Sequence, residues 1–484
     1  MRELIPRVAP LYLASMWNFK KQRVMKLNYI KTAMTVILLL QVTACTDILD
    51  KDPVSSFSAS GFYKTTADAQ AGVYGIYDAA QSVFRLNFCY WGEGRADNVQ
   101  TAQTGESLTL LSNNLNNTAS SADWTALYTM VSRANYAIRY IPDVYEDDNA
   151  TGRQLLGQAR ALRALAYFYL VRVWGDVPFI TEPYTSIEQD IFISRTDKET
   201  VLDLVEEDLE YAAENCVDKF NSNNDRIMFT KGSANALLTH VYMWRHKYPE
   251  AVTTSDLVLE NPLYSLVGIA DWGKMFSASY SKESIFEVGY NDTETNGLRT
   301  LYAVGSYAIY TPSEKWKASI EEGDLREDFV YDTIPVDPKA IWKYLGRGES
   351  DEVSTPAKQN IILIRLADIM LLRAEALNKI GGAANKDEAL SLLNTIRTRA
   401  GLTPFDAEAD AIAMYGDLES AILHERSVEL CFEGHRWFDL VRTGKAISTM
   451  GPINGLSNEA NLVWPIHQNA LNKNPNLVQN SFYQ

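Results

Sequence analysis

The sequence predicts a mainly α-helical protein, a scaffold of tetratricopeptide-like helix pairs with a loop-rich, partly β insertion. Apolar residues recur with helical spacing in four segments, and a short glycine-containing connection suggests that the last two form an antiparallel pair. Between the second and third segments, residues 264–345 mix short β-like runs with Gly, Pro, Ser and Asp. No 34-residue repeat accompanies the spacing, so the likeness to tetratricopeptide units is limited to the size of the helix pairs.

The composition excludes several classes of protein. The chain has 484 residues, 46% of them hydrophobic, which is too many for a disordered protein and enough for a large core. Its 45 basic and 61 acidic residues give a net charge of −16, whereas a nucleic-acid-binding protein needs clustered Lys and Arg. Four cysteines are too few for a disulfide scaffold or for paired zinc sites.

We predict that residues 1–44 are removed as a signal peptide, of which Met25 to Ala44 have the pattern of a secretion signal. Residues 1–24 fit no part of such a signal, so we expect translation to start at Met25. Two lysines lie near a short stretch, Ala33 to Leu40, that is apolar except for one threonine. This stretch is shorter than the ~20 apolar residues that span a hydrocarbon core. It ends in Val42-Thr43-Ala44-Cys45, which resembles the bacterial lipobox. We therefore predict cleavage before Cys45 and attachment of lipid to this residue; an ordinary signal peptide is the alternative.

The mature chain is predicted to be one large unit, residues 45–484, anchored to a membrane by more than one acyl chain. Without residues 1–44, which hold seven basic residues and one acidic residue, its net charge is −22. A surface with this charge is not attracted to anionic membrane lipids, so the acyl chains on Cys45 must provide the anchor. No Gly-Ser linker or long charge run divides this unit. We distinguish an N-terminal helical half (45–260), the loop-rich insertion (264–345) and a C-terminal helical part (346–484).

The helical segments share apolar residues at positions i, i+3, i+4 and i+7, which place these residues on one face of a helix. The connection Gly381 to Asn385 separates the last two segments, and Gly401 after Arg397 and Arg399 is a predicted helix stop. We expect all four faces to form core. The four sets are Leu162, Leu165, Ala166 and Tyr169; Ala234, Leu237, Leu238 and Val241; Ala367, Met370, Leu371 and Ala374; and Ala389, Leu392, Leu393 and Ile396.

Two regions lack this spacing. Residues 88–117 are rich in Gly, Asn, Thr and Gln, with no period, and are expected to be irregular. Within the insertion, Ser284 to Tyr290 and Leu301 to Tyr310 are β-like runs. Thr311-Pro312-Ser313 predicts the start of a helix whose aromatic residue, Trp316, faces the core. Loops on a rigid scaffold commonly hold a binding surface, so these regions are the first candidates for one.

Residues 425–442 interleave charged side chains with aromatic ones. Buried charges are tolerated when they are paired, so this pattern predicts a structural ion-pair cluster. The alternative is a pair of catalytic carboxylates, or a metal held by His424, Glu429 and His435. No H-E-x-x-H motif is present, and the neighbouring arginines would keep the acids ionised. We therefore predict a structural role for this segment.

The sequence lacks the common motifs of enzymes and of cofactor-binding sites. The chain has no G-x-S-x-G, no P-loop and no Gly-x-Gly-x-x-Gly at a strand–helix turn. The acidic residues Asp143, Glu146, Asp147 and Asp148 lack the glycine and the terminal glutamate of an EF-hand, which favours a solvated loop over a calcium site. The remaining cysteines, Cys89, Cys216 and Cys431, are predicted to be buried free thiols.

The C-terminal third carries four motifs, Glu425 to Leu430, Phe432 to Leu440, Trp464-Pro465-Ile466 and Asn474 to Asn480. In this order they resemble the SusD/RagB family of Bacteroidetes outer-membrane lipoproteins, and the resemblance spans roughly Cys45 to Asn480. Further matches are Phe62-Tyr63, Asp68-Ala69 and Tyr77; Trp124, Leu127, Tyr128, Asn135 and Ile138; Arg163-Ala164 and Gly175 to Pro178; Arg365 to Asp368 and Glu375-Ala376; and Leu393-Asn394 and Arg397.

This resemblance implies a lipoprotein on the cell exterior that binds an oligo- or polysaccharide and delivers it to a SusC-type TonB-dependent transporter. In the RagB branch of the family the ligand is a peptide, which is the main alternative. A glycoside hydrolase is a distant third, because it needs two carboxylates facing a cleft and no motif nominates such a pair.

The segment Tyr90 to Asn98 is the leading candidate for the glycan site. A sugar needs a flat aromatic face and planar polar groups, which Trp91 and the side chains of Arg95, Asp97 and Asn98 could supply. The starch-binding member of the family places an aromatic residue and an Asn in the comparable loop. Equally weighted is the alternative that Arg95 and Asp97 pair with each other or with neighbours and fix the loop.

Two tyrosines of the insertion, Tyr307 and Tyr310, are weaker candidates, since alternating tyrosines also suit a half-buried strand. If Trp91 is the platform, alanine at this position should weaken glycan binding at least tenfold, about 1.4 kcal/mol, without unfolding the protein.

Overall fold

The computed structural model describes residues 59–146, 149–302, 308–331, 341–344 and 357–484. The chain divides into two units, Met1–Phe62 and Tyr63–Gln484, and helix α2 (Ala59–Phe62) is the described part of the first. The predicted signal sequence and the lipid-attachment residue Cys45 lie outside the described residues.

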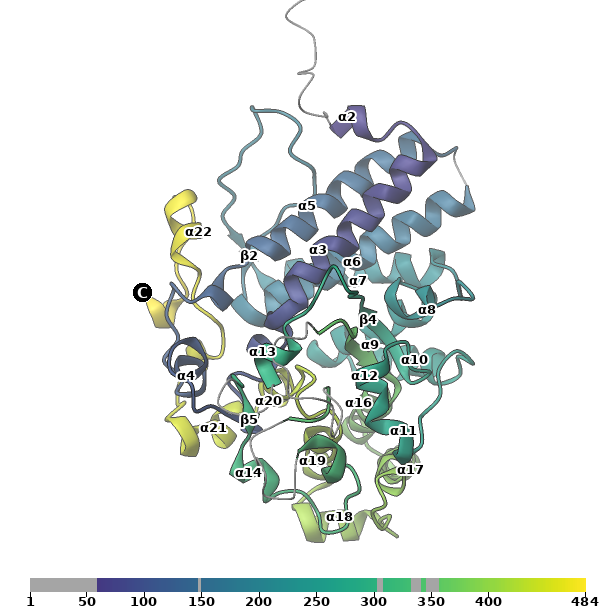
Figure 1. The fold of residues 1–484 in the computed structure, drawn as a ribbon, viewed down its shortest axis with the longest axis vertical. Helices are drawn as coiled ribbons and strands as arrows, with labels where there is room; N and C mark the ends of the chain where they lie inside the picture. The colour runs from purple at the N-terminus through teal and green to yellow at the C-terminus, as the bar shows by residue number, and fades with distance from the viewer. Residues whose placement is uncertain (1–58, 147–148, 303–307, 332–340, 345–356) are drawn as a thin grey trace, which may run out of the picture. The chain divides into compact units, whose positions relative to one another are not determined.

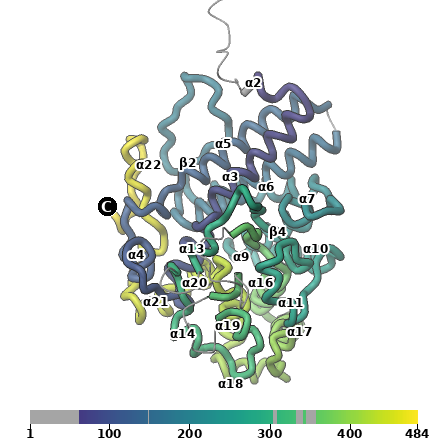
Figure 2. Tube along the Cα trace, in the orientation of Figure 1, coloured from purple at the N-terminus to yellow at the C-terminus, as the bar shows by residue number. Residues whose placement is uncertain are grey.

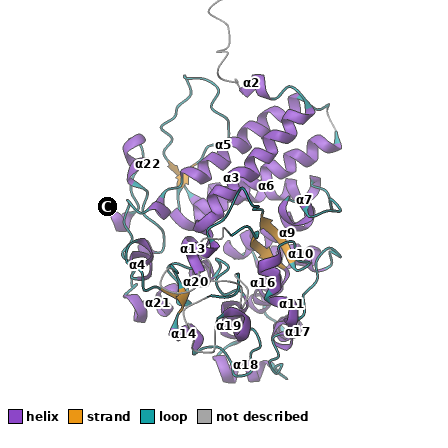
Figure 3. Ribbon diagram, in the orientation of Figure 1, coloured by secondary structure: helices purple, strands orange, loops and turns teal. Residues whose placement is uncertain are grey.

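Helices dominate the second unit, which confirms the predicted mainly α class (Figure 3). The nine longest helices in the described residues form the scaffold. They are α3 (Thr66–Gly92), α5 (Thr125–Tyr140), α6 (Ala150–Trp174), α7 (Lys198–Asn215), α9 (Lys231–Trp244), α10 (Tyr248–Leu259), α16 (Leu366–Ile380), α17 (Ala383–Arg399) and α19 (Leu418–Glu429).

Shorter helices connect and cover the scaffold. They are α4 (Glu106–Leu111), α8 (Asn224–Ile227), α11 (Ile269–Trp272), α12 (Lys274–Ala278), α13 (Leu298–Tyr302), α14 (Glu314–Lys317), α15 (Glu327–Val330), α18 (Glu408–Tyr415), α20 (Arg436–Arg442), α21 (Ala446–Asn454) and α22 (Gln468–Lys473).

Successive scaffold helices pack side by side, α3 on α5, α5 on α6, α6 on α7, and onward through α9, α10, α16 and α17 (Figure 1). Helix α6 is buried along most of its surface, as expected for a helix with apolar residues on all sides. Gly157 of α6 allows this packing, because a Cβ at this position would lie 2.9 Å from Cys216 Sγ. The stacked pairs give the tetratricopeptide-like scaffold that the sequence predicts.

The four predicted helical segments lie in α6, α9, α16 and α17. Gly381 and Gly382 separate the last two helices with φ of 79° and 86°, a conformation that favours glycine. Helix α17 ends at Arg399, and Gly401 follows with φ of 85°, which confirms the predicted stop.

The described residues also form three small antiparallel sheets. Strand β1 (Val99–Gln100) pairs with β5 (Thr311–Pro312), and β2 (Val177–Pro178) pairs with β3 (Arg195–Thr196). Strand β4 (Ser284–Val288) pairs with β6 (Ile361–Arg365), with Ser284 opposite Arg365 and Val288 opposite Ile361. Strand β4 confirms the predicted run at Ser284 to Tyr290.

The second predicted β run, Leu301 to Tyr310, is wrong at its start, because Leu301 belongs to α13. The Asn296 side chain accepts a hydrogen bond from Leu298 N (3.0 Å) and so supports the first turn of this helix. Leu301 and Tyr302 are then buried. The predicted helix start before Trp316 is confirmed, since the Ser313 hydroxyl accepts from Trp316 N (3.1 Å) at the N-terminus of α14.

Residues 88–117 are also more regular than expected, because α3 continues to Gly92 and α4 covers residues 106–111. Gly92 suggested a loop in the sequence, but its role is close packing: a Cβ there would collide with the backbone of Gly434.

The C-terminal segment returns to early parts of the chain. Figure 2 shows it in yellow beside α4 in dark blue. Asn454 Nδ2 donates to Leu111 O (2.9 Å) and Gln468 N donates to Asn117 O (2.7 Å). Among the residues that the structure describes, no helix combines the length and the apolar character needed to cross a membrane.

Candidate functional site

The charged C-terminal motif forms a buried ion-pair network, as predicted. Arg365 of β6 is fully buried and contacts three carboxylates, those of Glu283 (Nη1–Oε1 2.7 Å), Glu433 (Nε–Oε2 2.7 Å) and Glu429. Burial opposes ionisation of Glu429, but the guanidinium groups of Arg399, Arg365 and Arg326 hold its pKa well below the ordinary value. Fully paired charges of this kind fix the packing of β6 against α19.

The metal site that His424, Glu429 and His435 could have formed is not supported. No group of three His, Cys, Asp or Glu side chains suited to a metal occurs in the described part of the chain. His424 stacks on Tyr415 with ring centroids 4.7 Å apart. Burial lowers the pKa of both histidines to about 4, so both rings are neutral at pH 7. Cys89, Cys216 and Cys431 are buried free thiols, as predicted.

Trp91, the leading candidate from the sequence, lies in the core with 0% of its surface exposed. Its Nε1 donates to Ser121 O (2.8 Å), and its ring packs edge-on against Trp174 at 5.6 Å. The prediction of an open stacking face is therefore wrong. The last turn of α3 directs this indole toward α6, and the two glycines beside it do not open the segment to solvent.

The other predicted polar residues of this segment fix the loop. Arg95 is buried, donates to Asn461 O (2.6 Å) and Asn113 Oδ1 (2.7 Å), and lies 4.2 Å over the Trp437 ring. Asp97 pairs with Arg436 (Oδ1–Nε 2.8 Å). These contacts confirm the alternative in which Arg95 and Asp97 pair with neighbours.

The remaining candidates are also unavailable or undescribed. Asn98 is buried, and its Nδ2 donates to the carboxylate of Glu93. Burial raises the pKa of Glu93 to about 7. Tyr310 has 0% exposure and packs edge-on against Tyr90, so its prediction as a contact residue is wrong. Tyr307 lies outside the described residues.

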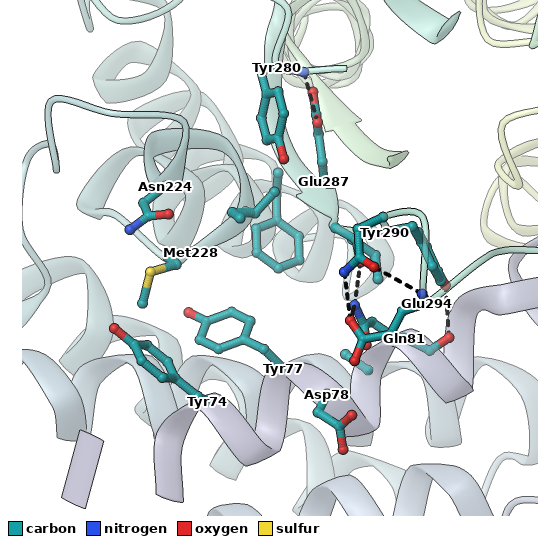
Figure 4. A pocket seen from close by; sticks show the side chains of 16 residues that line it. Tyr74, Tyr77, Asp78, Gln81, Asn224, Met228, Tyr280, Glu287, Tyr290 and Glu294 are labelled. Carbon is teal, nitrogen blue, oxygen red and sulfur yellow. Dashed lines mark hydrogen bonds between the residues drawn. The ribbon is translucent and has the colours of Figure 1, made fainter. Parts of the chain in front are cut away.

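A cavity of about 410 Å³ opens elsewhere, between α3, α8, β4 and the segment that follows β4 (Figure 4). Aromatic and polar side chains line most of it. The lining residues are Tyr74, Tyr77, Asp78, Ala80, Gln81, Asn224, Ile227, Met228, Tyr280, Phe286, Glu287, Val288, Gly289, Tyr290, Asn291 and Glu294.

Helix α3 supplies one wall through Tyr74, Tyr77, Asp78 and Gln81, which follow the spacing i, i+3, i+4 and i+7. Tyr77 is fixed, because its hydroxyl donates to Gln158 Oε1 (2.9 Å) and accepts from Phe229 N (2.8 Å). Tyr74 is 45% exposed and lies at the opening. This stripe was the signal that sequence reasoning missed.

The opposite wall comes from β4 and from the turn before it. Phe286 of β4 stacks on Phe229 with ring centroids 4.4 Å apart, which gives the cavity an apolar base. Tyr280 extends from the turn toward the same space as Tyr77, and Asn224 approaches from α8 (Figure 4). Arg226 ties α8 to this turn by donating to Ser281 O (2.9 Å).

Two polar groups at the cavity are free to meet a ligand. The Tyr280 hydroxyl and the Asn224 side-chain amide make no hydrogen bond with any residue that the structure describes. Tyr280 is 36% exposed. An amide and a hydroxyl beside aromatic rings suit a ligand that has both C–H faces and hydroxyl groups.

The three carboxylates of the lining are already engaged. Asp78 pairs with Arg133 (Oδ2–Nη1 2.5 Å), and Glu294 Oε2 accepts from Asn291 Nδ2 (2.8 Å) and Gln81 Nε2 (3.3 Å). Glu287 accepts from Tyr280 N and Asn360 Nδ2. The cavity thus has the chemistry of a binding site, with its acids committed to holding the walls.

Comparisons with known proteins agree with this architecture. Residues 306–483 match a family model described as the SusD family, and residues 49–243 match one described as starch-binding, associating with the outer membrane. A SusD-like protein of Formosa agariphila is 32% identical over 93% of this chain and 98% of its own length. A second SusD-like protein of that organism is 26% identical, over 92% of this chain and 98% of its own.

Solved structures give the same picture. A structure described as a laminarin-binding SusD-like protein superposes with a TM-score of 0.73 and 26% identity, over 87% of this chain and all of its own. A SusD homologue from Bacteroides thetaiotaomicron gives a TM-score of 0.73 and 25% identity, over 89% of this chain and all of its own.

Proposed function

This chain belongs to the SusD family, and from that premise we propose that it binds an oligo- or polysaccharide in the cavity between α3, α8 and β4. The observation that carries the proposal is the pair of free polar groups, on Tyr280 and Asn224, beside the aromatic walls. A pyranose ring packs its C–H face on such walls, while an amide pairs with its hydroxyls. A cavity of about 410 Å³ is within the usual size of small-ligand sites.

The proposed role is binding without catalysis. Hydrolysis of a glycoside requires an acid and a second carboxylate on either side of the bond. The carboxylates of this cavity instead hold Arg133, Asn291, Asn360 and backbone amides. We expect a bound glycan to be recovered intact, and release of reducing ends would contradict this part of the proposal.

Tyr280→Ala and Asn224→Ala should each weaken glycan binding at least tenfold, about 1.4 kcal/mol. Each change removes a contact at the cavity without altering a buried hydrogen bond. The ligand can be found on a glycan array that includes laminari-oligosaccharides, because one structural neighbour is described as laminarin binding. Titration calorimetry then gives the affinities.

The matched controls are Tyr184→Ala and Asn114→Ala, a tyrosine and an asparagine outside the cavity. These variants should bind like the unmodified protein. If the Tyr280 and Asn224 variants bound the glycan as tightly as the unmodified protein, the site would have to lie outside this cavity. Tight binding of peptides, with no glycan bound, would favour the RagB-like alternative.

We further propose that Cys45 carries lipid and that the mature chain, residues 45–484, delivers the glycan to a SusC-type TonB-dependent transporter at the cell exterior. The description of the matched family model supports an outer-membrane location.

Cys45→Ala should shift the protein from the membrane fraction to the soluble fraction. Cys216→Ala, which alters a buried thiol, is the control and should stay with the membrane. Membrane retention of the Cys45 variant would refute lipid anchoring. The tagged protein should also purify with the transporter, and repeated purification without it would refute the delivery role.

A further inference from the structure

Two polar side chains, Glu287 of β4 in the cavity lining and Asn360 just before β6, connect the segments that carry the tyrosines of the cavity. Glu287 Oε2 accepts hydrogen bonds from Tyr280 N (3.0 Å) and from Asn360 Nδ2 (2.6 Å). Asn360 Oδ1 accepts from Tyr290 N (3.0 Å). One carboxylate–amide pair therefore reaches the backbone of a tyrosine before β4 and of another after it.

The turn that presents Tyr280 has an unfavourable backbone. Ser279 and Tyr280 have φ of 59° and 56°, in the left-handed region that side-chain-bearing residues rarely adopt. The same two residues hold both, because the backbone N–H of Asn360 donates to Ser279 Oγ (2.8 Å) and the Glu287 carboxylate accepts from Tyr280 N. Strained residues persist where their surroundings fix them, and they are frequent at ligand sites.

The second tyrosine is fixed at both ends. Tyr290 donates through its hydroxyl to Gln81 O of α3 (2.8 Å), while Asn360 holds its backbone N–H. Tyr290 thus joins the wall formed by α3 to the β4 side of the cavity, as Figure 4 shows.

Burial of the Glu287 carboxylate costs free energy. Glu287 is 0% exposed, and among the described residues no cation lies within ion-pair distance of its carboxylate. Burial raises the pKa of Glu287, although hydrogen bonds from Asn360, Tyr280 and Ser284 and the charge of Arg226 oppose the rise. A buried carboxylate without an ion pair does not stabilise a fold, so its presence needs another reason.

We propose that Glu287 and Asn360 are positioning residues that hold Tyr280 and Tyr290 in the geometry required for glycan binding. This inference rests on the proposed function of the cavity. Neither residue needs to contact the ligand. The pair acts through the backbone of the two tyrosines and through the turn at Ser279.

The test compares Glu287→Leu with Glu287→Gln. The carbonyl oxygen of Gln can occupy the position of Oε2 and accept both hydrogen bonds, with its amide directed to the Ser284 side. Leu has a similar volume but accepts neither bond. We expect the Leu variant to bind the glycan at least tenfold more weakly than the unmodified protein. The Gln variant should keep its affinity within about twofold and should lose no thermal stability.

A matched control separates positioning from general destabilisation. Leu393→Ala removes a buried side chain of α17 outside the cavity and lowers the unfolding temperature. At a temperature where every variant is folded, it should bind the glycan normally. Amide hydrogen exchange gives a second readout: the N–H groups of Tyr280 and Tyr290 should exchange faster in the Leu variant and not in the Gln variant.

If Glu287→Leu does not fold, Asn360→Ala takes its place, since it removes the acceptor for Tyr290 N. Normal glycan binding by the Glu287→Leu or Asn360→Ala variant would overturn the inference. So would an equal loss of glycan affinity in the Glu287→Leu and Glu287→Gln variants, or the same loss in the Leu393→Ala control. If the unmodified protein binds no glycan, the proposed function fails. The exchange measurement, which needs no ligand, would then still decide whether this pair holds the tyrosines.

Discussion

Replacing Arg365 with methionine lowers the free energy of unfolding by about 3–5 kcal/mol. The guanidinium is fully buried and serves the carboxylates of Glu283, Glu429 and Glu433 together with Glu429 O. Methionine fills a similar volume but leaves three buried acids with fewer partners. Arg399 and Lys343 remain beside them and limit the loss. Urea denaturation at pH 7 measures the change.

The control for Arg365 is Lys358→Met. Lys358 pairs with Asp292 at 2.9 Å, but the two side chains are 63% and 82% exposed. Water and salt screen such a pair, so its loss should cost less than about 1 kcal/mol. If the Arg365 variant were as stable as this control, the ion-pair network would not hold the fold together.

Trp91→Ala lowers the free energy of unfolding by about 3–5 kcal/mol, the usual cost of emptying a buried aromatic site. The indole is fully buried, is hydrogen-bonded to Ser121 O and packs against Trp174 and Tyr169. Because Trp91 does not line the cavity, the folded fraction should bind glycan as tightly as the unmodified protein.

Phe482→Ala is the matched aromatic control for Trp91. Phe482 is 44% exposed, so its removal should change stability by less than about 1 kcal/mol. A Trp91 variant of unchanged stability that had lost glycan affinity would restore the interpretation drawn from sequence alone and contradict the structure.

The sequence predicted the scaffold well because helical periodicity is a local signal. The apolar faces of α6, α9, α16 and α17 can be read within windows of eight residues, and Gly401 marks an end that lies beside its helix. The ion-pair network was also predictable, since its acids and arginines alternate with aromatic residues in one segment.

The site could not be predicted in the same way, because it is assembled from α3, α8 and β4, which are far apart in sequence. The glycines near Trp91 suggested an open loop, yet Gly92 serves contact with Gly434. The left-handed backbone at Tyr280 leaves no mark in the sequence, because a tyrosine rarely adopts it. The Tyr74 to Gln81 stripe was visible, but only the fold shows that it faces a cavity.

The network and the cavity share a structural element. Arg365 lies at one end of β6, opposite Ser284, while Asn360 precedes the other end. The ion pairs therefore fix the strand pair from which Glu287 and Asn360 reach the tyrosines. The ion-pair network thus contacts one end of this sheet, and Glu287 and Asn360, at its other end, hold the strained turn at Ser279 and Tyr280.

The central claim is that the glycan occupies the cavity between α3, α8 and β4. A crystal structure with the best-bound neutral oligosaccharide tests it directly. We expect a sugar ring packed between Tyr280 and Tyr77, with its hydroxyls within hydrogen-bond distance of the Asn224 amide. Clear sugar density elsewhere on the protein, with this cavity empty, would contradict the account.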